Sequence, residues 1–470
     1  MVWCLEQFKE NIALREESGH TLSYGKLSEE TKRIAGVVGG RCLVFSLCRN
    51  TIGSVIGYVA FLNGHIPPVL LNSHLEETLL AGLLQTYQPA FIWIPAEQED
   101  QFTEMESVYR CYDYVLLKTK YKTKYPLYDR LGLLLTTSGS TGSPKLVRQS
   151  YENILDNARA IASYLELDAT ESPITTLPMN YTYGLSIINS HLLVGATLLL
   201  TEKTLMHKEF WRFFKEAGAT SFGGVPYTYE MLDRLRFFRM DLPSLRTMTQ
   251  AGGKLLPELH ERFAAYAQEN GKKFVVMYGQ CEATARMGYL PPERAIEKKG
   301  SMGIVIPGGK FHLIDADGNE ITEPLTTGEL VYEGKNVTLG YAECVEDLAK
   351  GDERNGILET GDMAQFDADG FYYIVGRKKR FLKIYGNRVN LDEIDWMVKG
   401  KFGIDAAAGG IDDHMYIFVT EEGHADSIRE FVAGKTGLNP AAFQVLTINE
   451  IPKNDAGKTL YQELERYYEL

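Results

Sequence analysis

Cysteine is scarce in this sequence: six occur among 470 residues, and no two form a Cys-x-x-Cys pair. Disulfide frameworks and zinc sites both depend on closely and regularly spaced cysteines, so neither is indicated. The pattern is typical of a reducing compartment, and we expect a cytoplasmic location.

Positive charge is in short supply as well. Lys and Arg total 49 against 62 Asp and Glu, which gives a formal net charge of −13. Proteins that bind DNA or RNA gain most of their affinity by neutralising phosphates, so no nucleic-acid partner is expected. A single nucleotide needs only a few cations and backbone N–H groups, and this charge balance does not exclude one.

Long hydrophobic runs are also missing. Two long uncharged stretches, 51–71 and 172–201, are interrupted by glycine, proline and asparagine. A membrane-spanning helix needs about 20 predominantly apolar residues, so we expect no membrane span. The N-terminal segment carries charges among its apolar positions and has neither the apolar core nor the cleavage site of a signal peptide.

What the sequence does have is an alternation of strand and helix patterns. Short apolar runs at 42–48, 66–71 and 90–95 are separated by helical segments, one that we expect Asn50 to cap and one at 74–88. Strands joined by helices through short connections predict a parallel, doubly wound sheet. The same alternation continues through strand-like runs at 131–137, 196–202 and 274–279 and a helix at 207–218.

The pattern changes from about residue 300, where short glycine-rich segments alternate with strand-like ones. This spacing predicts a β-rich subdomain. The stretch 381–470 has a mixed pattern of helices and strands. The predicted fold class is therefore α/β, with a large N-terminal domain of doubly wound sheets, a β-rich subdomain and a small α+β C-terminal domain.

A glycine-, serine- and threonine-rich loop, T-S-G-S-T-G-S-P-K, follows the predicted strand at 131–137. Its glycines allow a tight turn that points successive N–H groups at one anion, and its hydroxyls and lysine add further donors. It is not a Walker P-loop, and such clusters are often only surface loops. Its position after a strand favours ligand binding. The candidate phosphate-binding residues are Thr137, Ser138, Gly139, Ser140, Thr141, Gly142 and Lys145.

This loop resembles the phosphate loop of the adenylate-forming superfamily, which contains acyl- and aryl-CoA synthetases, luciferases and peptide-synthetase adenylation domains. Four further motifs follow in the family's order: Y-G-Q-C-E-A-T at 278–284, T-G-D at 360–362, G-R-K-K-R at 376–380 and N-D-A-G-K at 454–458. The segment L-S-Y-G-K-L at 22–27 is also similar to the family's pattern. Two positions depart from it: Cys281 replaces a threonine, and Arg380 replaces an aspartate or lysine.

The resemblance implies an enzyme that activates a small carboxylic acid with ATP, releases pyrophosphate, and passes the acyl group to a thiol. The loop from Thr137 to Lys145 would hold the β- and γ-phosphates, and Glu282 would bind Mg²⁺ together with Thr141. The adenine would lie between the Tyr278 ring and the backbone at Gly252 and Gly253. The implied nucleotide site also includes Gly279, Gln280 and Cys281 of the motif at 278–284.

Three more residues receive roles only through this resemblance. Asp362 would accept hydrogen bonds from the ribose hydroxyls, and Arg377 would donate to the same sugar. Lys458 would bridge the reacting carboxylate and the α-phosphate, which makes Lys458, Thr141 and Glu282 the implied catalytic residues. In isolation, T-G-D indicates a turn, and a lysine near the end of a chain indicates a solvated side chain.

The resemblance also divides the chain into an AMP-binding domain at 1–379 and a small mobile domain at 380–470 that carries Lys458. Family members swing this domain about a hinge, which here falls at Arg380. The arginine keeps the positive charge of those relatives that have lysine at this position.

The acid pocket is predicted to contain mainly aromatic residues and glycine. Tyr181 occupies a position where CoA ligases often carry histidine, and Thr182 one where peptide synthetases carry the aspartate that binds an ammonium group. A neutral hydroxyl does not offset the desolvation of an ammonium group, so amino acids are disfavoured and an aryl or medium acyl acid is favoured. The predicted pocket residues are Tyr181, Tyr183, Phe222, Gly223, Gly224 and Gly279.

The acceptor and the reaction class leave alternatives open. Six basic residues at 377–388 suit either the 3′-phosphate of CoA or a separate acidic acyl carrier protein, and both present a phosphopantetheine thiol. Other possibilities are an enzyme that loads an amino or hydroxy acid onto a carrier protein, a non-catalytic nucleotide-binding relative, and a phosphotransferase. The later motifs argue against the last two.

Overall fold

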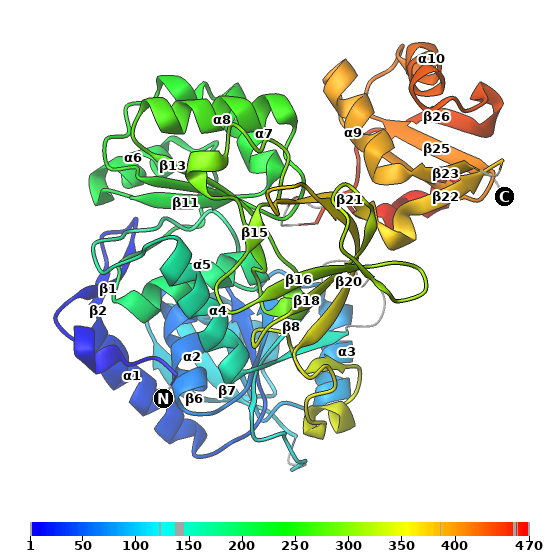
Figure 1. Cartoon of the computed structure of the whole chain (residues 1–470). Coiled ribbons are helices and arrows are strands. Elements are labelled where there is room, and N and C mark those ends of the chain that lie inside the picture. The colour runs from blue at the N-terminus through cyan, green and yellow to red at the C-terminus, as the bar shows by residue number, and fades with distance from the viewer. Residues whose placement is uncertain are drawn as a thin grey trace.

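The computed structural model describes residues 2–121, 124–136, 145–385, 387–454, 457 and 459–468. Its largest sheet has eight strands in the order β19-β9-β8-β4-β3-β5-β7-β6 (Figure 1). The four inner strands, β8, β4, β3 and β5, are mutually parallel, and the outer ones run antiparallel to their inner neighbours. The strands are β3 (Val44–Cys48), β4 (Pro68–Asn72), β5 (Phe91–Pro95), β6 (Glu106–Cys111), β7 (Tyr114–Lys118), β8 (Leu131–Thr136), β9 (Leu146–Ser150) and β19 (Gly340–Ala342).

Side chains of this sheet alternate between two apolar cores, as expected for strands buried on both faces. Val44 and Cys48 pack with α2 (Ile52–Asn63), whereas Phe45 and Leu47 pack with α3 (Glu77–Tyr87). The predicted strand–helix alternation is therefore confirmed. The predicted cap is wrong: Asn50 does not cap α2, because its side chain bonds the loop at Leu177 and Met179.

A second sheet begins with the parallel strands β11 (Ser221–Gly224), β12 (Thr247–Gln250) and β13 (Lys273–Tyr278). Its outer face packs against α6 (Lys208–Ala217), α7 (Pro226–Arg234) and α8 (Pro257–Glu269). Its inner face packs against α4 (Tyr151–Tyr164) and α5 (Thr182–Val194), which also contact the eight-stranded sheet. Short strands β14 (Gly288–Tyr289) and β15 (Ile304–Val305) complete it, and a third sheet joins β10 (Leu198–Leu200), β1 (Ile12–Glu16) and β2 (Thr21–Ser23).

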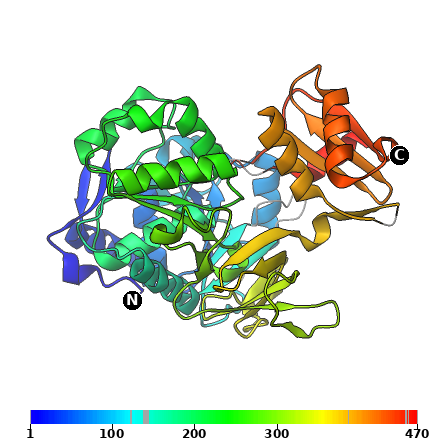
Figure 2. The same ribbon diagram turned by 45° about the horizontal axis from the view of Figure 1, so that its top comes forward.

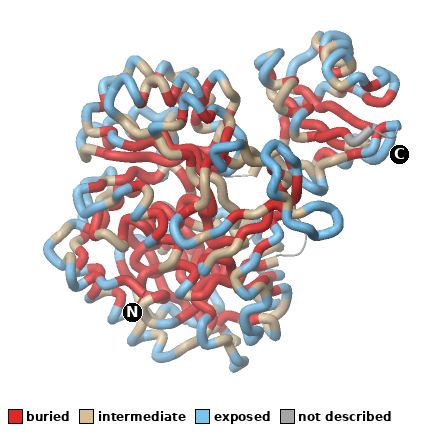
Figure 3. Tube along the Cα trace, viewed as in Figure 1, coloured by how far each residue is buried: buried red, intermediate tan, exposed pale blue. Residues whose placement is uncertain are grey.

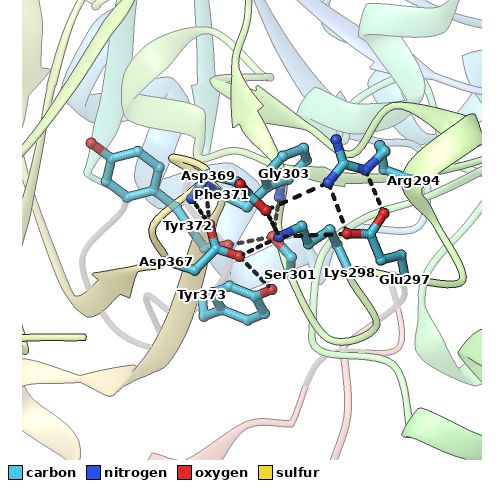
Figure 4. A network of polar contacts seen from close by, with 10 residues as sticks. All are labelled: Arg294, Glu297, Lys298, Ser301, Gly303, Asp367, Asp369, Phe371, Tyr372 and Tyr373. Carbon is cyan, nitrogen blue, oxygen red and sulfur yellow. Dashed lines mark hydrogen bonds and ion pairs between the residues drawn. The ribbon is translucent and has the colours of Figure 1, made fainter. Parts of the chain in front are cut away.

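The predicted β-rich region is an antiparallel sheet of order β17-β16-β18-β20-β21. A polar network joins it to the segment after β14 (Figure 4). Lys298 Nζ lies 2.9 Å from Asp367 Oδ2 and 2.5 Å from Asp369 Oδ2, and Ser301 donates to the Tyr372 carbonyl. These contacts fix the turn between the two strands that carry Asp362 and Arg377. The strands are β16 (Lys310–Ile314), β17 (Glu320–Ile321), β18 (Gly328–Glu333), β20 (Ile357–Phe366) and β21 (Tyr372–Arg377).

The C-terminal region has a hydrophobic core of its own, which includes Ile394, Ile417 and Val432. It stands beside the rest of the molecule in two views (Figures 1 and 2), and its buried positions form a separate group (Figure 3). This α+β arrangement matches the predicted class. Its elements are β22 (Phe381–Ile384), β23 (Asn387–Asn390), α9 (Leu391–Phe402), β24 (Ala406–Ile411), β25 (His414–Val419), α10 (Ala425–Thr436) and β26 (Phe443–Thr447).

The helices that the structure describes are too short to cross a membrane, since the longest, α1 (Tyr24–Val38), has 15 residues. Among the described residues, none is long and apolar enough to cross one.

Candidate active site

Three motifs that lie far apart in the sequence meet at the Asp362 carboxylate. Asp362 Oδ2 accepts hydrogen bonds from the Tyr278 hydroxyl at 2.5 Å and from Gln280 Nε2 at 2.7 Å. Arg377 Nε lies 3.0 Å from Asp362 Oδ1, and the Asp362 side chain is only 4% exposed. The antiparallel pairing of β20 with β21 places Asp362 directly opposite Arg377, and β13 brings Tyr278 to the same point.

The phenol of Tyr278 and the guanidinium of Arg377 both keep their protons, because the Asp362 carboxylate helps to raise the pKa of each. Burial and the neighbouring Asp362 carboxylate raise the pKa of Tyr278 well above its ordinary value, so its O–H remains a donor. A carboxylate offers about four lone-pair sites, and the three side chains above leave acceptor capacity for one more donor. Arg377 is half exposed, so its guanidinium is accessible from outside the cluster. The arrangement suits a sugar bearing vicinal hydroxyls.

The predicted adenine-binding glycines lie at the end of β12. Gly252 has a φ of +85°, and a Cβ added there would lie 2.9 Å from the Tyr181 hydroxyl and 3.0 Å from Val225 Cγ1. A Cβ on Gly253 would lie 3.1 Å from Pro226 Cγ. Neither position has ready room for a side chain, so Tyr181 and the start of α7 lie close to the backbone at these two glycines. A flat ring that approaches this backbone closely fits such a surface.

One tyrosine links the predicted phosphate loop to the predicted magnesium ligand. The Tyr341 hydroxyl donates to Glu282 Oε1 at 2.8 Å, and Lys145 Nζ lies 3.9 Å from the centre of the Tyr341 ring. Lys145 also pairs with Glu343 at 3.5 Å. Sequence reasoning missed Tyr341 because it belongs to none of the recognised motifs. The predicted loop residues Thr137, Ser138, Gly139, Ser140, Thr141 and Gly142 lie outside the described residues.

Glu282 fits a magnesium ion that is held mostly by its substrate. Within the described ranges, no group of three or more His, Cys, Asp or Glu side chains forms a metal cage. Mg²⁺ usually takes one or two carboxylates and completes its octahedron with phosphate oxygens and water. Glu282, a half-buried carboxylate that shares its neighbour Tyr341 with Lys145, is the single donor that this mode requires.

The turn that presents Glu282 depends on a glycine. A Cβ on Gly279 would lie 1.7 Å from the Ala285 carbonyl oxygen, which no side chain tolerates. The chain therefore folds back tightly after β13, and the 3₁₀ turn Cys281–Ala283 follows. The Glu282 carbonyl accepts from Arg354 Nη1 at 3.0 Å and from the Thr338 hydroxyl at 2.9 Å. These bonds hold the turn in place.

The two predicted pocket tyrosines lie at the start of α5, with ring centres 6.4 Å apart. The Tyr183 hydroxyl lies 2.8 Å from Thr249 Oγ1 and 2.9 Å from a Cβ that Gly223 lacks. The Tyr183 ring therefore fills the space left by that glycine. Thr182 donates its hydroxyl to the Thr284 carbonyl, so it is already occupied by backbone.

Phe222 lies on the other face of β11. Its ring packs near Phe214, Tyr229 and Phe237 in the core beneath the outer helices. Successive side chains of a strand point to opposite faces, so Gly223 faces the tyrosines while Phe222 and its neighbour Gly224 face α7. The structure therefore brings Tyr183 next to Tyr181 and Gly223, and places Phe222 and Gly224 on the opposite face of β11.

A buried arginine next to these tyrosines was missed by the sequence reasoning. Arg286 is 3% exposed, and its guanidinium carbon lies 5.3 Å from the centre of the Tyr183 ring. It follows the motif at 278–284 by two positions, and this proximity to a recognised motif was the available signal.

The predicted hinge residue is held firmly by the C-terminal region. Arg380 Nε lies 2.6 Å from Asp392 Oδ1, Nη2 lies 2.8 Å from Asp395 Oδ2, and its guanidinium carbon lies 3.5 Å from the centre of the Tyr461 ring. Burial raises the pKa of Asp395 to about 6 despite the arginine. Lys378 also pairs with Glu329 at 2.6 Å. The segment 377–388 therefore offers less unpaired positive charge than its composition suggests.

Lys458, the predicted catalytic lysine, lies outside the described residues. Its neighbour Gly457 is described, and a Cβ added there would lie 3.4 Å from Val225 Cγ2 and 3.5 Å from Tyr227 Cβ. Val225 is also the residue that borders Gly252. The chain therefore passes next to Val225, close to the predicted adenine-binding glycine Gly252, immediately before Lys458.

Comparison with known proteins gives relatives that are named as CoA ligases. The chain is 29% identical to the peroxisomal OPC-8:0-CoA ligase 1 of Arabidopsis thaliana, over 72% of this chain and 64% of that protein. It is 28% identical to the oxalate–CoA ligase of the same plant, over 70% of this chain and 66% of that protein. The chain thus spans just under two thirds of the length of these relatives.

Solved structures share its fold over nearly the whole length. The O-succinylbenzoate coenzyme A synthetase of Bacillus subtilis, in complex with AMP, superposes with a TM-score of 0.80 at 22% identity, covering 98% of this chain and 97% of that one. The ATP-bound MatB of Rhodopseudomonas palustris gives a TM-score of 0.79 at 19% identity, covering 97% and 96%. These neighbours confirm the predicted fold class.

The family model described as AMP-binding enzyme matches residues 2–342, which include the predicted phosphate loop, the pocket tyrosines and Glu282. Asp362, Arg377 and Arg380 lie beyond the matched stretch. The match covers well over half of the sequence, and the chain belongs to the AMP-binding enzyme family.

Proposed function

We propose that this protein activates a carboxylic acid with ATP and Mg²⁺ and then transfers the acyl group to a phosphopantetheine thiol. In the first step a carboxylate oxygen attacks the α-phosphorus, the bond to pyrophosphate breaks, and an acyl-adenylate forms. In the second step the thiolate attacks the acyl carbon and AMP leaves. The contacts of Tyr278 and Arg377 with Asp362, together with the contacts of Glu282 and Lys145 with Tyr341, support this proposal most directly.

Each residue has a role that its chemistry suits. Asp362 and Arg377 would bind the ribose, the backbone at Gly252 would border the adenine, and Glu282 would hold Mg²⁺. That ion would neutralise charge on the phosphates when bound. Lys458 would supply a cation between the carboxylate and the α-phosphate, where electrostatic stabilisation is most effective.

The names of the relatives favour CoA as the acceptor but leave the acid open. They are described as ligases of oxalate, 2-succinylbenzoate and indoleacetate with CoA, which are chemically different acids. A separate acyl carrier protein would present the same thiol. The cytoplasmic location and the movement of residues 380–470 about Arg380 remain predictions.

Acid-dependent exchange of radiolabelled pyrophosphate into ATP tests the proposal. A panel of aryl, acyl, amino and dicarboxylic acids is supplied in turn with Mg²⁺. We expect exchange with at least one acid, and loss of exchange when Mg²⁺ is chelated. If the folded protein binds ATP yet supports exchange with none of the acids, the proposed activity is wrong.

A further inference from the structure

Arg286 is a buried cation whose bonding partners are all neutral. It is 3% exposed, its Nε donates to Ser186 Oγ at 3.1 Å, and its Nη1 donates to Tyr164 Oη at 3.0 Å and to Met277 Sδ at 3.3 Å. A guanidinium has five N–H groups, and these bonds use three of them. Among the described residues, no carboxylate pairs with Arg286 and Nη2 has no acceptor.

A second buried arginine shows how this chain compensates such a charge elsewhere. The Arg148 side chain is 0% exposed, and its Nη2 lies 2.5 Å from Glu353 Oε2. It also donates to the backbone carbonyls of four residues: Leu339, Tyr341, Lys350 and Gly351. An uncompensated buried charge is costly, so the absence of a comparable anion at Arg286 calls for a partner from outside the chain.

The guanidinium of Arg286 lies where the acid is expected. Two of its neighbours, Tyr183 and Met277, belong to the apolar cluster that also contains Val225 and Ala251. Val225 and Ala251 border Gly252, at the nucleotide side of the site. A Cβ on Gly279, which is also predicted to line the acid pocket, would lie 2.9 Å from Arg286 Cα. Arg286 therefore lies next to Tyr183 and Gly279, two of the residues predicted to form the acid pocket.

We propose that the acid substrate is a dicarboxylate, whose second carboxylate pairs with Nη2 of Arg286 while the first is adenylated. This inference rests on the proposed function. The guanidinium fork matches a carboxylate, and the charge-assisted bonds gain strength in a site from which water is excluded. The aromatic rings of Tyr183 and Tyr164 would line the body of the acid. Ser186 and Tyr164 are positioning residues, because their hydroxyls orient the guanidinium.

The preference for a dicarboxylate should be large, because a bound monocarboxylate would bury the Arg286 guanidinium without supplying a carboxylate to pair with it. Sites built around a polar contact reject analogues that lack the matching group far more strongly than apolar pockets reject a missing methylene. We therefore expect the wild-type protein to prefer one dicarboxylate over its monocarboxylate isostere, in which a methyl group replaces the second carboxylate, by at least about 100-fold in kcat/KM.

Pyrophosphate exchange with matched acid pairs tests the inference. The pairs are glutarate with valerate, adipate with hexanoate, and isophthalate with m-toluate, assayed on the wild type and on Arg286→Met and Arg286→Lys. In Arg286→Met we expect the preferred dicarboxylate to lose about 100-fold, mainly through KM, while its isostere is unaffected or improved. Arg286→Lys should keep part of the preference. Arg148→Met serves as the control for removal of a buried arginine, and its diacid-to-monoacid ratio should equal that of the wild type.

The outcomes separate the inference from the proposed function. If monocarboxylates support exchange by the wild type as well as or better than dicarboxylates do, the inference is overturned and the proposed function stands. This comparison needs no variant. An unchanged diacid-to-monoacid ratio in folded Arg286→Met or Arg286→Lys would also overturn it. Exchange with no acid would overturn both.

Discussion

The nucleotide half and the acid half of the site differ in how their charges are satisfied. In the nucleotide half, Asp362 already has bonds from Tyr278, Gln280 and Arg377. In the acid half, Arg286 has only hydroxyl and thioether partners. The nucleotide half is thus organised before any ligand arrives, whereas the acid half leaves a charge for its ligand to complete.

This difference predicts three kinds of mutational effect. Changes in the nucleotide half should weaken adenylation equally for every acid. Changes at Arg286 should alter which acid is used. Changes at buried charges outside both halves should lower stability alone.

The largest expected effect comes from Lys458→Ala, which removes the cation proposed to join the two halves. Adenylation should fall on the order of 1,000-fold or more with every acid, because a cation that stabilises a phosphoryl transition state contributes that much. ATP binding should persist. The measurement is pyrophosphate exchange together with ATP titration, and Lys401→Ala, on the exposed surface, is the control. Normal adenylation by the variant would contradict the role given to Lys458.

Arg148→Met should produce the largest loss of stability without a change in acid preference. It leaves the buried carbonyls and Glu353 without their donor, and breaking such a pair costs about 3–5 kcal/mol. Urea denaturation measures the free energy of unfolding, and the exposed Arg33→Met is the comparison. A wild-type stability for Arg148→Met would show that this network is dispensable.

Asp362→Asn should weaken the nucleotide half by about 100-fold. The neutral amide loses the charge-assisted bonds to Arg377 and to the ribose, each contributing about 1.5–3 kcal/mol. ATP affinity and exchange should fall together, by the same factor for each acid. Asp317→Asn, on an exposed turn, should leave both unchanged. An effect that depended on the acid would remove the distinction between the two halves.

The smallest expected effect is a change in the pH dependence of stability. Burial, with help from Arg286, lowers the pKa of His191 to about 4 from its ordinary 6.5. The unfolded chain then binds more protons than the folded one between these values, so stability is lost as pH falls. From pH 7 to pH 5 the loss is about 2 kcal/mol.

His191→Gln should flatten this slope, whereas His74→Gln, at an exposed position, should preserve it. The measurement is urea denaturation at both pH values. Identical slopes for the wild type and His191→Gln would mean that His191 does not titrate as its burial requires.

Much of the fold was predictable because its signals are local. The apolar runs of β3, β4, β5 and β13 and the helices α2, α3 and α6 were expected close to where they occur. The convergence of Tyr278, Asp362 and Arg377 was expected from a resemblance rather than from any local pattern. The strand–helix periodicity itself does not indicate which distant segments meet.

What sequence reasoning missed depends on tertiary contacts. Tyr341 acquires its place only when β19 pairs with β9 and brings it next to Lys145 and Glu282. Asn50 looked like a helix cap, but the loop at 177–179 competes for its side chain. The position of Phe222 follows from strand alternation, which fixes its face only once the register of β11 is known.

The most direct test measures binding of two non-reactive acyl-sulfamoyl adenosines, one with a distal carboxylate and one with a methyl group in its place. Calorimetry would compare the wild type with Asp362→Asn and Arg286→Met. We predict that Asp362→Asn weakens both compounds by the same factor, and that Arg286→Met weakens only the one with the distal carboxylate. If Arg286→Met weakens both compounds equally, or neither, the division of the site into two halves is contradicted.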